Sequence, residues 1–399
     1  MRKSTRRIGV LTSGGDAPGL NAVIRAVVKA ASGMGWETLG IQDGFEGLLG
    51  EKNYRVLTNA DVQGLLPRGG TILRTTNKGH FGVRNPNVAP EEDPYVQAVQ
   101  SIEELGLHGL ITIGGEGTQR IALELYKLGA PVIGVPKTID NDLAGTDRTF
   151  GFDTALQVAT DAIDRLHTTA ASHNRVMVLE VMGRHTGWIA LHAGLAGGAD
   201  VILIPEIPFS IDTVANKIRE REERGNTFSI VVVAEGSRAV DGDVMYVSDG
   251  RLGGVGQFVG DRLQQLTDKD TRVVVLGHLQ RGGSPTPYDR LLSTRYGAAA
   301  VSAAAKSIFG EMVALRAQDI ITVPLTEATG HLKTVRPHSD LVLCARALGV
   351  SFGDEGGGAE FTGGNALAWL RWPGPALRRD RSGDALSAGA GCTAVRELR

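Results

Sequence analysis

Cysteine is scarce in this 399-residue sequence, which contains only Cys344 and Cys392. Two cysteines near the carboxyl end cannot form a disulfide framework, and this favours a reducing compartment. Long apolar runs are also absent, and the basic start MRKSTRR leads directly into a short apolar run rather than the longer one that a signal peptide needs. We therefore expect a cytoplasmic protein that does not enter membranes.

An excess of charge of either sign is missing as well. The formal net charge is −2, with 42% hydrophobic and 22% charged residues. This balance weighs against broad electrostatic attraction to nucleic acid or to a membrane surface, so neither is an expected partner. The composition is that of an ordinary globular protein, and the length is sufficient for two domains.

Neither standard nucleotide-binding motif, G-x-G-x-x-G or G-x-x-x-x-G-K-[ST], follows the first apolar run. This absence weighs against a dinucleotide-dependent oxidoreductase. The chain instead continues with LTSGGDAPGLNAVIRAVV, residues 11–28, a glycine-rich turn that leads into a helical pattern. The amide groups and the dipole at a helix start attract anions, whereas Asp16 inside the turn favours a metal ion or a hydroxyl-bearing ligand. A tight turn without a ligand is the alternative.

Glycine is abundant, and many of the 54 glycines end short, continuous apolar runs, which is typical of alternating α/β folds. Continuous apolar runs predict strands that are buried on both faces of a parallel sheet. The predicted strands are 8–11, 109–113, 132–135, 176–181, 201–204, 229–234 and 273–276, and the predicted helices include 154–168, 212–223, 255–266 and 288–308. We predict the α/β class, with two sheets of mostly parallel strands.

A second glycine turn, ITIGGEGTQRIA, also combines an acid with a hydroxyl. Gly114 and Gly115 end a predicted strand, and Glu116 and Thr118 begin a predicted helix. Because ligands of open α/β sheets bind at the carboxyl ends of parallel strands, two such turns can face one crevice. An acid among phosphate-binding amides is explained if Mg²⁺ lies between the acid and the phosphates. The alternative is that Glu116 only complements the helix dipole.

A third stretch, VPKTIDNDLAGTD, places Asp140, Asp142 and Asp147 near Lys137, directly after a predicted strand. A carboxylate near a lysine and a Mg²⁺-bound phosphate stays ionised at neutral pH. It can then take the proton from an attacking hydroxyl, as the base of a kinase does. The alternative is a set of aspartates that only form Asx-turns.

Basic side chains and one further acid accompany three more predicted strands. They are Arg175, Arg184, Glu235, Arg272, His278 and Arg281. Guanidinium groups bind phosphate bidentately, and a glutamate can accept hydrogen bonds from sugar hydroxyls. Together they indicate an anionic, polyhydroxylated substrate that faces a metal-bound phosphoryl donor. Taken singly, each is also explained as a surface ion-pair partner, and His278 as a core histidine.

The motifs GGDAPGLNA, GGEGT, PKTIDND, EVMGRHTGW and GHLQRGGSPTPYDR occur in this order, and with them the chain closely resembles 6-phosphofructokinases from about residue 7 to about residue 350. The resemblance implies phosphorylation of fructose 6-phosphate at O1 to fructose 1,6-bisphosphate in glycolysis, with Mg²⁺ and ATP. It also implies two interleaved three-layer domains. Residues 1–150 and about 265–315 would bind the donor, and 151–264 and about 316–353 the sugar phosphate. Residues 354–399, rich in Gly, Ala and Arg, are predicted to be a flexible tail.

The resemblance also implies individual roles. Asp140 would be the base, with Thr138 and Asp142 beside it, and Glu116 the Mg²⁺-associated acid. The residues matching donor-binding positions are Gly15, Asn77, Lys78, Gly115, Glu116, Gly117 and Thr118, and those matching sugar-phosphate-binding positions are Met182, Gly183, Arg184, Glu235, His278 and Arg281. Arg175 and Arg272 match arginines that reach the substrate from a neighbouring subunit, so we expect a homodimer or homotetramer with shared sites.

The sequence departs from the familiar members of the family at three places. Glu116 stands where the well-known bacterial ATP enzymes have aspartate, so its contact with the metal is direct or through water. Asn77 and Lys78 occupy the nucleotide-contacting pair in place of the usual residues. Allosteric relatives have arginine and lysine residues around an effector pocket. Arg25 is present here, but some of the other basic residues are replaced, with His167 and Asn226 at two of these positions.

The phosphoryl donor receives a mixed signal. Gly117 is typical of ATP users, whereas Lys137 is typical of pyrophosphate users. A carboxylate at position 117 would crowd and repel the α-phosphate of a nucleotide, while glycine leaves room for it, so we predict ATP. The alternative is a pyrophosphate-dependent fructose 6-phosphate 1-phosphotransferase. A non-catalytic sugar-phosphate sensor is a remote alternative, because such a protein would be expected to lack Asp140.

Overall fold

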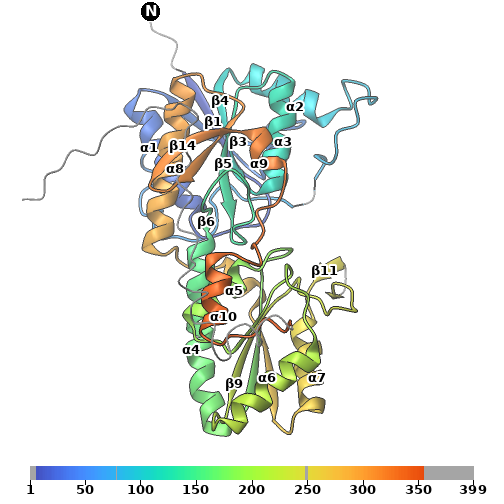
Figure 1. The fold of residues 1–399 in the computed structure, drawn as a ribbon. Helices are drawn as coiled ribbons and strands as arrows, with labels where there is room; N and C mark the ends of the chain where they lie inside the picture. The colour runs from blue at the N-terminus through green and yellow to red at the C-terminus, as the bar shows by residue number, and fades with distance from the viewer. Residues whose placement is uncertain (1–5, 78, 248–249, 355–399) are drawn as a thin grey trace, which may run out of the picture. The chain divides into compact units, whose positions relative to one another are not determined.

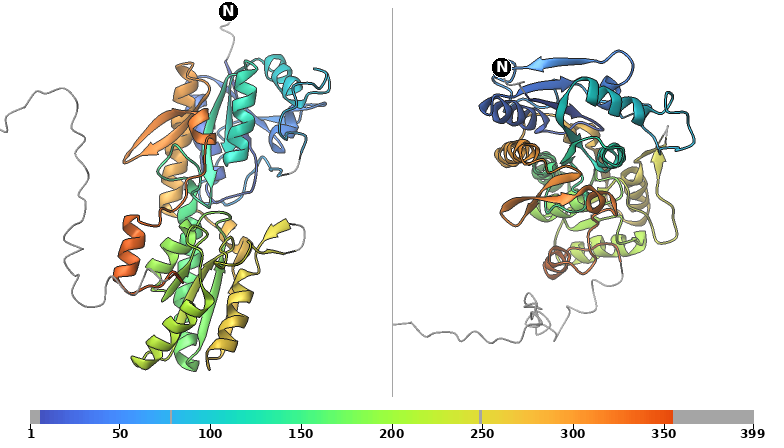
Figure 2. Two further views of the ribbon diagram at one scale, coloured as in Figure 1. Left: turned by 45° about the vertical axis from the view of Figure 1, so that its right-hand side comes forward. Right: turned by 90° about the horizontal axis from the view of Figure 1, so that it is seen from above.

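Two main β-sheets, each with helices on both faces, form the described part of the chain (Figures 1 and 2). The computed structural model describes residues 6–77, 79–247 and 250–354. Strand pairs inside both sheets are mostly parallel. The predicted α/β class with mostly parallel sheets is therefore confirmed.

The larger sheet has eight strands in the order β14-β13-β5-β4-β1-β2-β3, with β6 beside β5. Its strands are β1 (Arg7–Thr12), β2 (Glu37–Ile41), β3 (Tyr54–Leu57), β4 (Leu107–Gly114), β5 (Val132–Thr138), β6 (Phe150–Gly151), β13 (Glu311–Arg316) and β14 (Asp319–Pro324). Among the described strands of this sheet, the edge pairs β2–β3 and β13–β14 alone are antiparallel. The central strands are buried on both faces, which explains why they read as continuous apolar runs.

Two separate layers of helices cover the larger sheet. One face packs against α1 (Leu20–Gly33) and α8 (Pro287–Ala305), and the other against η1 (Gly44–Leu48), α2 (Pro94–Glu104), α3 (Glu116–Lys127) and α9 (Leu325–Thr329). Although α1 and α8 are far apart in the sequence, Figures 1 and 2 show them side by side in blue and orange.

The smaller sheet has the order β12-β7-β9-β8, with every pair parallel. Its strands are β7 (Val176–Val181), β8 (Val201–Leu203), β9 (Ser229–Ala234) and β12 (Thr271–Val275). One face packs against α4 (Phe152–His173), α5 (Trp188–Ala196) and α10 (Asp340–Ala347), and the other against α6 (Ile211–Glu223) and α7 (Val255–Leu266). A separate hairpin pairs β10 (Tyr246–Val247) with β11 (Arg251–Leu252).

Sheet membership differs from the predicted domain ranges at two strands. β12, which falls in the range assigned to donor binding, lies in the smaller sheet because α7 returns the chain parallel to β7. β14, which falls in the range assigned to sugar binding, lies in the larger sheet because a two-residue turn folds it back on β13. The ranges as functional domains stay a prediction. The predicted tail, beyond Asp354, lies outside the described residues.

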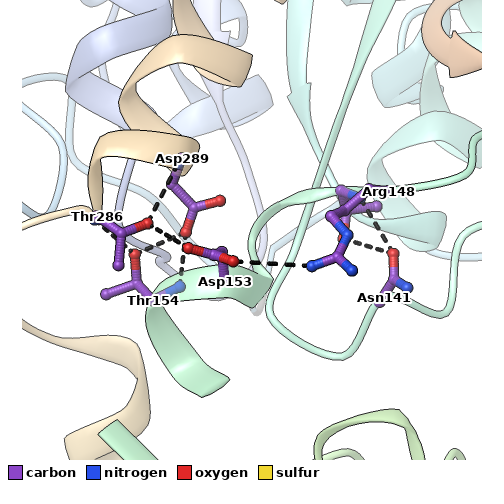
Figure 3. Close-up of polar contacts among 7 residues, drawn as sticks. Asn141, Arg148, Asp153, Thr154, Thr286 and Asp289 are labelled. Carbon is purple, nitrogen blue, oxygen red and sulfur yellow. Dashed lines mark hydrogen bonds and ion pairs between the residues drawn. The ribbon is translucent and has the colours of Figure 1, made fainter. Parts of the chain in front are cut away.

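The two sheets are joined where α4 and α8 begin (Figure 3). The buried carboxylate of Asp289 in α8 accepts hydrogen bonds from the amide and the hydroxyl of Thr154 in α4, at 2.8 and 2.6 Å. Thr286, the N-cap of α8, accepts from the Asp289 amide at 3.2 Å and donates to Asp153 at 2.7 Å. Since α4 has no side-chain cap of its own at Gly151, the first turn of α8 supplies it. Within the described ranges, no helix combines the length and apolar character that crossing a membrane requires.

Candidate active site

The glycine turns of the larger sheet meet at one edge of that sheet. β1, β4 and β5 are neighbours and parallel, so the loops after them leave at the same edge. After β1 the chain adds β2 and β3 on one side of that strand, and then β4 and β5 on its other side. The strand order therefore reverses between β1 and β4, which makes this position a topological switch point. Ligands of open α/β sheets bind at such points, which supports a site between the turn after β1 and the turn before α3.

Lys137 ties two of these loops together. The side chain is 4% exposed, and its Nζ donates a hydrogen bond to the carbonyl oxygen of Gly15. A Cβ atom placed on Gly14 would lie 3.6 Å from both Lys137 Nζ and Thr118 Oγ1, so the three loops converge here. Burial and, to a smaller extent, the nearby Arg281 lower the pKa of Lys137 to about 8, while Asp140, Asp16 and Asp142 oppose this shift.

Asp140 lies directly beyond β5 and is 3% exposed. Its amide donates to Thr138 Oγ1 at 3.0 Å, while its own Oδ1 is buried without a hydrogen-bond partner in the protein. Burial raises the pKa of Asp140, Asp142 raises it further, and Arg281 opposes them. The sequence-based expectation of a carboxylate that stays ionised is therefore too simple for the protein alone, because removal of water outweighs the neighbouring cations.

The smaller sheet contributes the loops after β7, β9 and β12. The Met182 amide donates to Gln280 Oε1 at 2.8 Å, and the Arg184 amide donates to Glu235 Oε1 at 3.0 Å. Arg184 has a φ of 51° and follows Gly183, whose φ is 144°. A Cβ on Gly183 would lie 2.5 Å from the Thr186 carbonyl oxygen, so this turn requires glycine. The Arg184 side chain is exposed.

Hydrogen bonds join the loops of the two sheets at the site. Thr186 Oγ1, after β7, donates to the carbonyl oxygen of Asp140 at 3.3 Å. Arg281, after β12, donates to the carbonyl oxygen of Asp16 at 3.2 Å. These bonds place the predicted sugar-phosphate residues of the smaller sheet opposite the predicted donor residues of the larger one.

Arg175 and Arg272 do not join this cluster. Arg175 precedes β7 and Arg272 lies near the start of β12, whereas Arg184 and Arg281 follow the ends of the same strands. The six residues of β7 span about 20 Å at ~3.3 Å per residue. Both arginines pair with Asp270, and Arg175 Nε lies 2.6 Å from its Oδ2. Within one chain they therefore lie at the opposite edge of the sheet.

The remaining predicted residues lie around the donor side and on the surface. Glu116 begins α3 and pairs with Arg120 one turn later. The Nη2 atom of Arg120 lies 2.6 Å from Oε2 of Glu116. Gly117 faces open space, since an added Cβ would meet no atom within 4 Å. Asn77 and His278 are exposed, and Lys78 lies outside the described residues. His167, from the predicted effector pocket, contacts the Gly197 carbonyl oxygen at 2.7 Å.

Magnesium is the metal that the family resemblance implies. Mg²⁺ usually binds one or two protein carboxylates together with substrate phosphates and waters. Among the described residues no group of three or more His, Cys, Asp or Glu side chains is arranged to hold a metal alone. A metal that arrives with the donor would fit the carboxylates present here. Asp140 Oδ1 has no hydrogen-bond partner in the protein and Asp142 lies nearby, while Glu116 stands in the first turn of α3.

Sequence reasoning missed several residues that support the site. Gln280, fully buried, orients the loop after β7 through Met182. Glu206 accepts hydrogen bonds from the Gly187 amide at 3.0 and 3.1 Å, and Lys333 contacts the loop that follows Asp140. Gln280 lies inside the motif GHLQRGGSPTPYDR, so the sequence contained a signal for it, whereas no spacing rule connects Lys333 to residue 140.

A buried carboxyl, a cation at a glycine turn and arginines from facing loops are the parts that phosphoryl-transfer enzymes require. The family model described as phosphofructokinase matches residues 7–304. The "ATP-dependent 6-phosphofructokinase" of Chloroflexus aurantiacus is 80% identical over 355 residues, which cover 89% of this chain and 100% of the relative. The "Pyrophosphate--fructose 6-phosphate 1-phosphotransferase" of Amycolatopsis methanolica is 52% identical over 340 residues, 83% of this chain and 96% of the relative.

The solved structure of Pichia pastoris phosphofructokinase in the T-state is similar as well, with a TM-score of 0.74 and 33% identity. The match covers 83% of this chain but spans only 36% of the yeast chain. The chain therefore belongs to the phosphofructokinase family, as the sequence resemblance predicted.

Proposed function

We propose that the protein is an ATP-dependent 6-phosphofructokinase, which transfers the γ-phosphoryl group of ATP to O1 of fructose 6-phosphate. The observation that carries this is the pair of hydrogen bonds, Thr186 to Asp140 and Arg281 to Asp16, between the loops of the two sheets. They support one crevice in which a donor on the larger sheet meets a sugar phosphate on the smaller one. The 80% identity to a relative named as ATP-dependent supports the same activity.

Asp140 acts as the general base. As O1 of the sugar forms its bond to the γ-phosphorus, the bond from that phosphorus to the β-bridging oxygen breaks, and ADP leaves with the electron pair. The O1 proton moves to the carboxylate of Asp140. The buried Oδ1 without a protein partner is available to receive it. Thr138 Oγ1 fixes the backbone of this turn by accepting a hydrogen bond from the Asp140 amide.

The sugar phosphate is held by the loops of the smaller sheet. Arg184, Glu235, His278 and Arg281 would bind its phosphate and hydroxyl groups, with Met182 and Gly183 shaping the floor. Glu235 accepts a hydrogen bond from the Arg184 amide. The carboxylate that would bind a sugar hydroxyl therefore also holds the backbone of the arginine that would bind the phosphate. Burial raises the pKa of Glu235, and the Arg184 amide hydrogen bond opposes the shift.

Magnesium, when bound with ATP, would offset the phosphate charge that builds up during transfer. Glu116 and the carboxylates of the loop after β5 are the residues that would hold it, directly or through water. The Glu116 carboxylate would then either release Arg120 or bind the metal and Arg120 at the same time. Gly15, Gly115, Gly117 and Thr118 would surround the donor phosphates, with Asn77 and Lys78 towards the nucleoside.

The donor is ATP because the space around Gly117, the residue that we expect to select the donor, is free. Gly117 lies in the first turn of α3 with free space around it. A nucleotide α-phosphate can approach the backbone there, whereas a carboxylate would repel it. Pyrophosphate is the second candidate, which Lys137 and the 52% identity to a pyrophosphate-dependent relative favour.

A second copy of the chain would complete the site. Arg175 and Arg272 lie at the far edge of β7 and β12, too distant to reach the sugar phosphate of their own chain. The edge strand of the smaller sheet, β12, ends in exposed apolar side chains, Val275 at 56% and, just beyond the strand, Leu279 at 69%, which suits burial against another copy. We therefore propose a homodimer or homotetramer in which each sugar site receives these arginines from its neighbour.

The deciding experiment is a coupled assay for fructose 1,6-bisphosphate, run with the purified full chain, Mg²⁺ and either ATP or pyrophosphate. We expect turnover with ATP and much lower kcat/KM with pyrophosphate. Turnover with pyrophosphate alone would assign the second candidate. Binding of fructose 6-phosphate without turnover with either donor would identify a sensor and contradict the proposal.

A further inference from the structure

Lys333 lies in the segment between α9 and α10, far along the chain from the motifs of the site. Its Nζ donates to Asn141 Oδ1 at 2.9 Å and to the carbonyl oxygens of Thr146 and Asp147, each at 3.0 Å. An ammonium group has three N–H donors, and all three are used here. Every acceptor belongs to the loop that begins immediately after Asp140.

The backbone of Lys333 reinforces this attachment. Its amide donates to the Asp142 carbonyl oxygen at 2.8 Å, and the neighbouring Leu332 pairs with Leu143 in an antiparallel bridge. One residue therefore contacts both ends of the 141–147 loop, with its side chain and with its main chain. Without Lys333, the Asn141 amide oxygen would keep only its hydrogen bonds from Thr149, and the carbonyl oxygen of the buried Thr146 would lose this donor.

The same segment is also fixed to the smaller sheet. Trp188 Nε1, at the start of α5, donates to the Lys333 carbonyl oxygen at 2.7 Å. Two residues later the Val335 amide donates to Glu206 Oε1 at 2.8 Å, and Glu206 in turn accepts from the Gly187 amide. Lys333 thus lies between the loop that carries Asp140 and the loop that carries Met182 and Gly183.

Asn141 explains why the attachment matters for chemistry. Its φ of 53° is left-handed, a conformation that asparagine tolerates better than most residues but that needs support from its surroundings. Its side-chain oxygen receives Lys333 Nζ and also the Thr149 amide at 3.1 Å. The carboxyl of Asp140 precedes this strained position, so movement of Asn141 would move the base.

We propose that Lys333 is a positioning residue for phosphoryl transfer, whose ammonium group holds the 141–147 loop and thereby sets the place of Asp140. This inference rests on the proposed function. Burial lowers the pKa of Lys333 to about 8, so it still carries its charge at neutral pH. Placement errors of about 1 Å at a reacting group can lower rates about 10²-fold, so a group that touches neither substrate can still control kcat.

The test compares Lys333→Met and Lys333→Ala with wild type in the ATP assay. We expect kcat to fall about 10-fold to 100-fold while KM for both substrates changes less than about threefold, because most of the binding groups lie outside the 141–147 loop. Propylamine replaces the atoms that the alanine variant lacks, so it should restore part of kcat in that variant, whereas propanol should not. Lys333→Arg should retain more activity than Lys333→Met.

Controls separate this role from simple instability. Lys306→Met removes an exposed lysine at the far end of α8 and should leave kcat unchanged. Thermal unfolding is measured for every variant, and the assay is run well below the lowest melting temperature. Unchanged kcat in Lys333→Met, or amine rescue of the melting temperature without rescue of kcat, overturns the inference. Absence of turnover in wild type with either donor would instead contradict the proposed function.

Discussion

Lys137 Nζ donates its hydrogen bond to the carbonyl oxygen of Gly15, and so a buried cation on β5 is held against the turn after β1. Burial, with help from Arg281, lowers the pKa of Lys137 to about 8. The charge is therefore largely present at neutral pH but decreases as the pH rises through that value. A cation in this place would favour an incoming phosphate, which connects the structure to a measurable pH dependence.

We expect kcat/KM for ATP to fall as the pH rises through about 8, because kcat/KM reports the ionisation of the free enzyme. In Lys137→Met this alkaline decrease should be reduced, with a lower plateau. The measurement is a pH profile of kcat/KM between about pH 6 and about pH 9.5, a range that brackets the pKa of the group. The stability of each variant is checked at both ends. An identical alkaline limb in the variant would show that another group causes it.

The acidic side of the same profile reports on Asp140. Its protonated form cannot accept the O1 proton, so activity is lost as the pH falls through its pKa. Because burial and Asp142 raise the pKa of Asp140, we expect this decrease at higher pH than for an ordinary aspartate. A profile that stays flat down to about pH 5 would argue against this base or against its raised pKa.

Replacement of the base gives a direct test. Asp140→Ser should lower kcat by about 10²-fold or more while KM for fructose 6-phosphate changes little, since a positioned base acts mainly in the transition state. Asp164→Ser, on the exposed side of α4, is the matched control and should retain wild-type turnover. Near-normal kcat in the Asp140 variant would remove Asp140 from the role of base.

Shared sites can be tested by mixing two inactive variants. Asp140→Ser lacks the base but keeps Arg272, and Arg272→Ala keeps the base, so a hybrid dimer contains one complete site. A purified hybrid dimer, with one complete site of two, would recover about half of wild-type activity. Differently tagged subunits are co-expressed and the hybrid is purified through both tags. No recovery in verified hybrids would contradict sharing through Arg272.

The sequence predicted the central strands well because burial on both faces produces continuous apolar runs. The prediction for β7 and β9 matches the structure residue for residue. β3 and β14 were missed, and both are edge strands with mostly exposed side chains. The interior strands β2 and β13 were missed as well, although most of their residues are buried. The motifs also indicated which loops meet, since parallel strands end at one edge.

Other parts of the site could not be read from the chain alone. Lys333 contacts the loop after Asp140 across 186 to 192 residues of sequence, and its neighbours form no recognisable spacing. The raised pKa of Asp140 depends on how completely packing removes water, which composition does not reveal. The pairing of Glu116 with Arg120, by contrast, follows from i,i+4 spacing on a helix and can be predicted from the sequence.

The junction of α4 and α8 in Figure 3 predicts a stability effect. Asp289→Ala leaves the Thr154 amide and hydroxyl without their acceptor, so the free energy of unfolding should fall by about 1.5–3 kcal/mol. Burial raises the pKa of Asp289 to about 6 from its ordinary 3.8, so the folded state holds this proton more tightly than the unfolded state does. Its contribution to stability therefore decreases as the pH rises between these values.

Asp289→Asn is the control for that measurement, because its amide oxygen still accepts hydrogen bonds while the ionisation is gone. Denaturant unfolding at about pH 4.5 and about pH 7 should show a smaller pH dependence in Asp289→Asn than in wild type. Equal stability of Asp289→Ala and wild type at both pH values would mean that the junction contributes nothing measurable.

Gly117 gives the sharpest prediction about the donor. An added Cβ atom meets no atom within 4 Å, so we expect Gly117→Asp to fold normally and its effect to arise only when a donor is bound. A carboxylate there would repel the α-phosphate of ATP, which pyrophosphate lacks, and we expect kcat/KM for ATP to fall at least about 10-fold more than kcat/KM for pyrophosphate. Gly117→Asn has nearly the same size without the charge, so the difference between the two variants measures repulsion rather than crowding. Both constants are taken from the coupled assay at fixed Mg²⁺ and ionic strength. If Gly117→Asp lowers the two donors equally, position 117 does not select the donor, and Lys137 becomes the residue to test for that role.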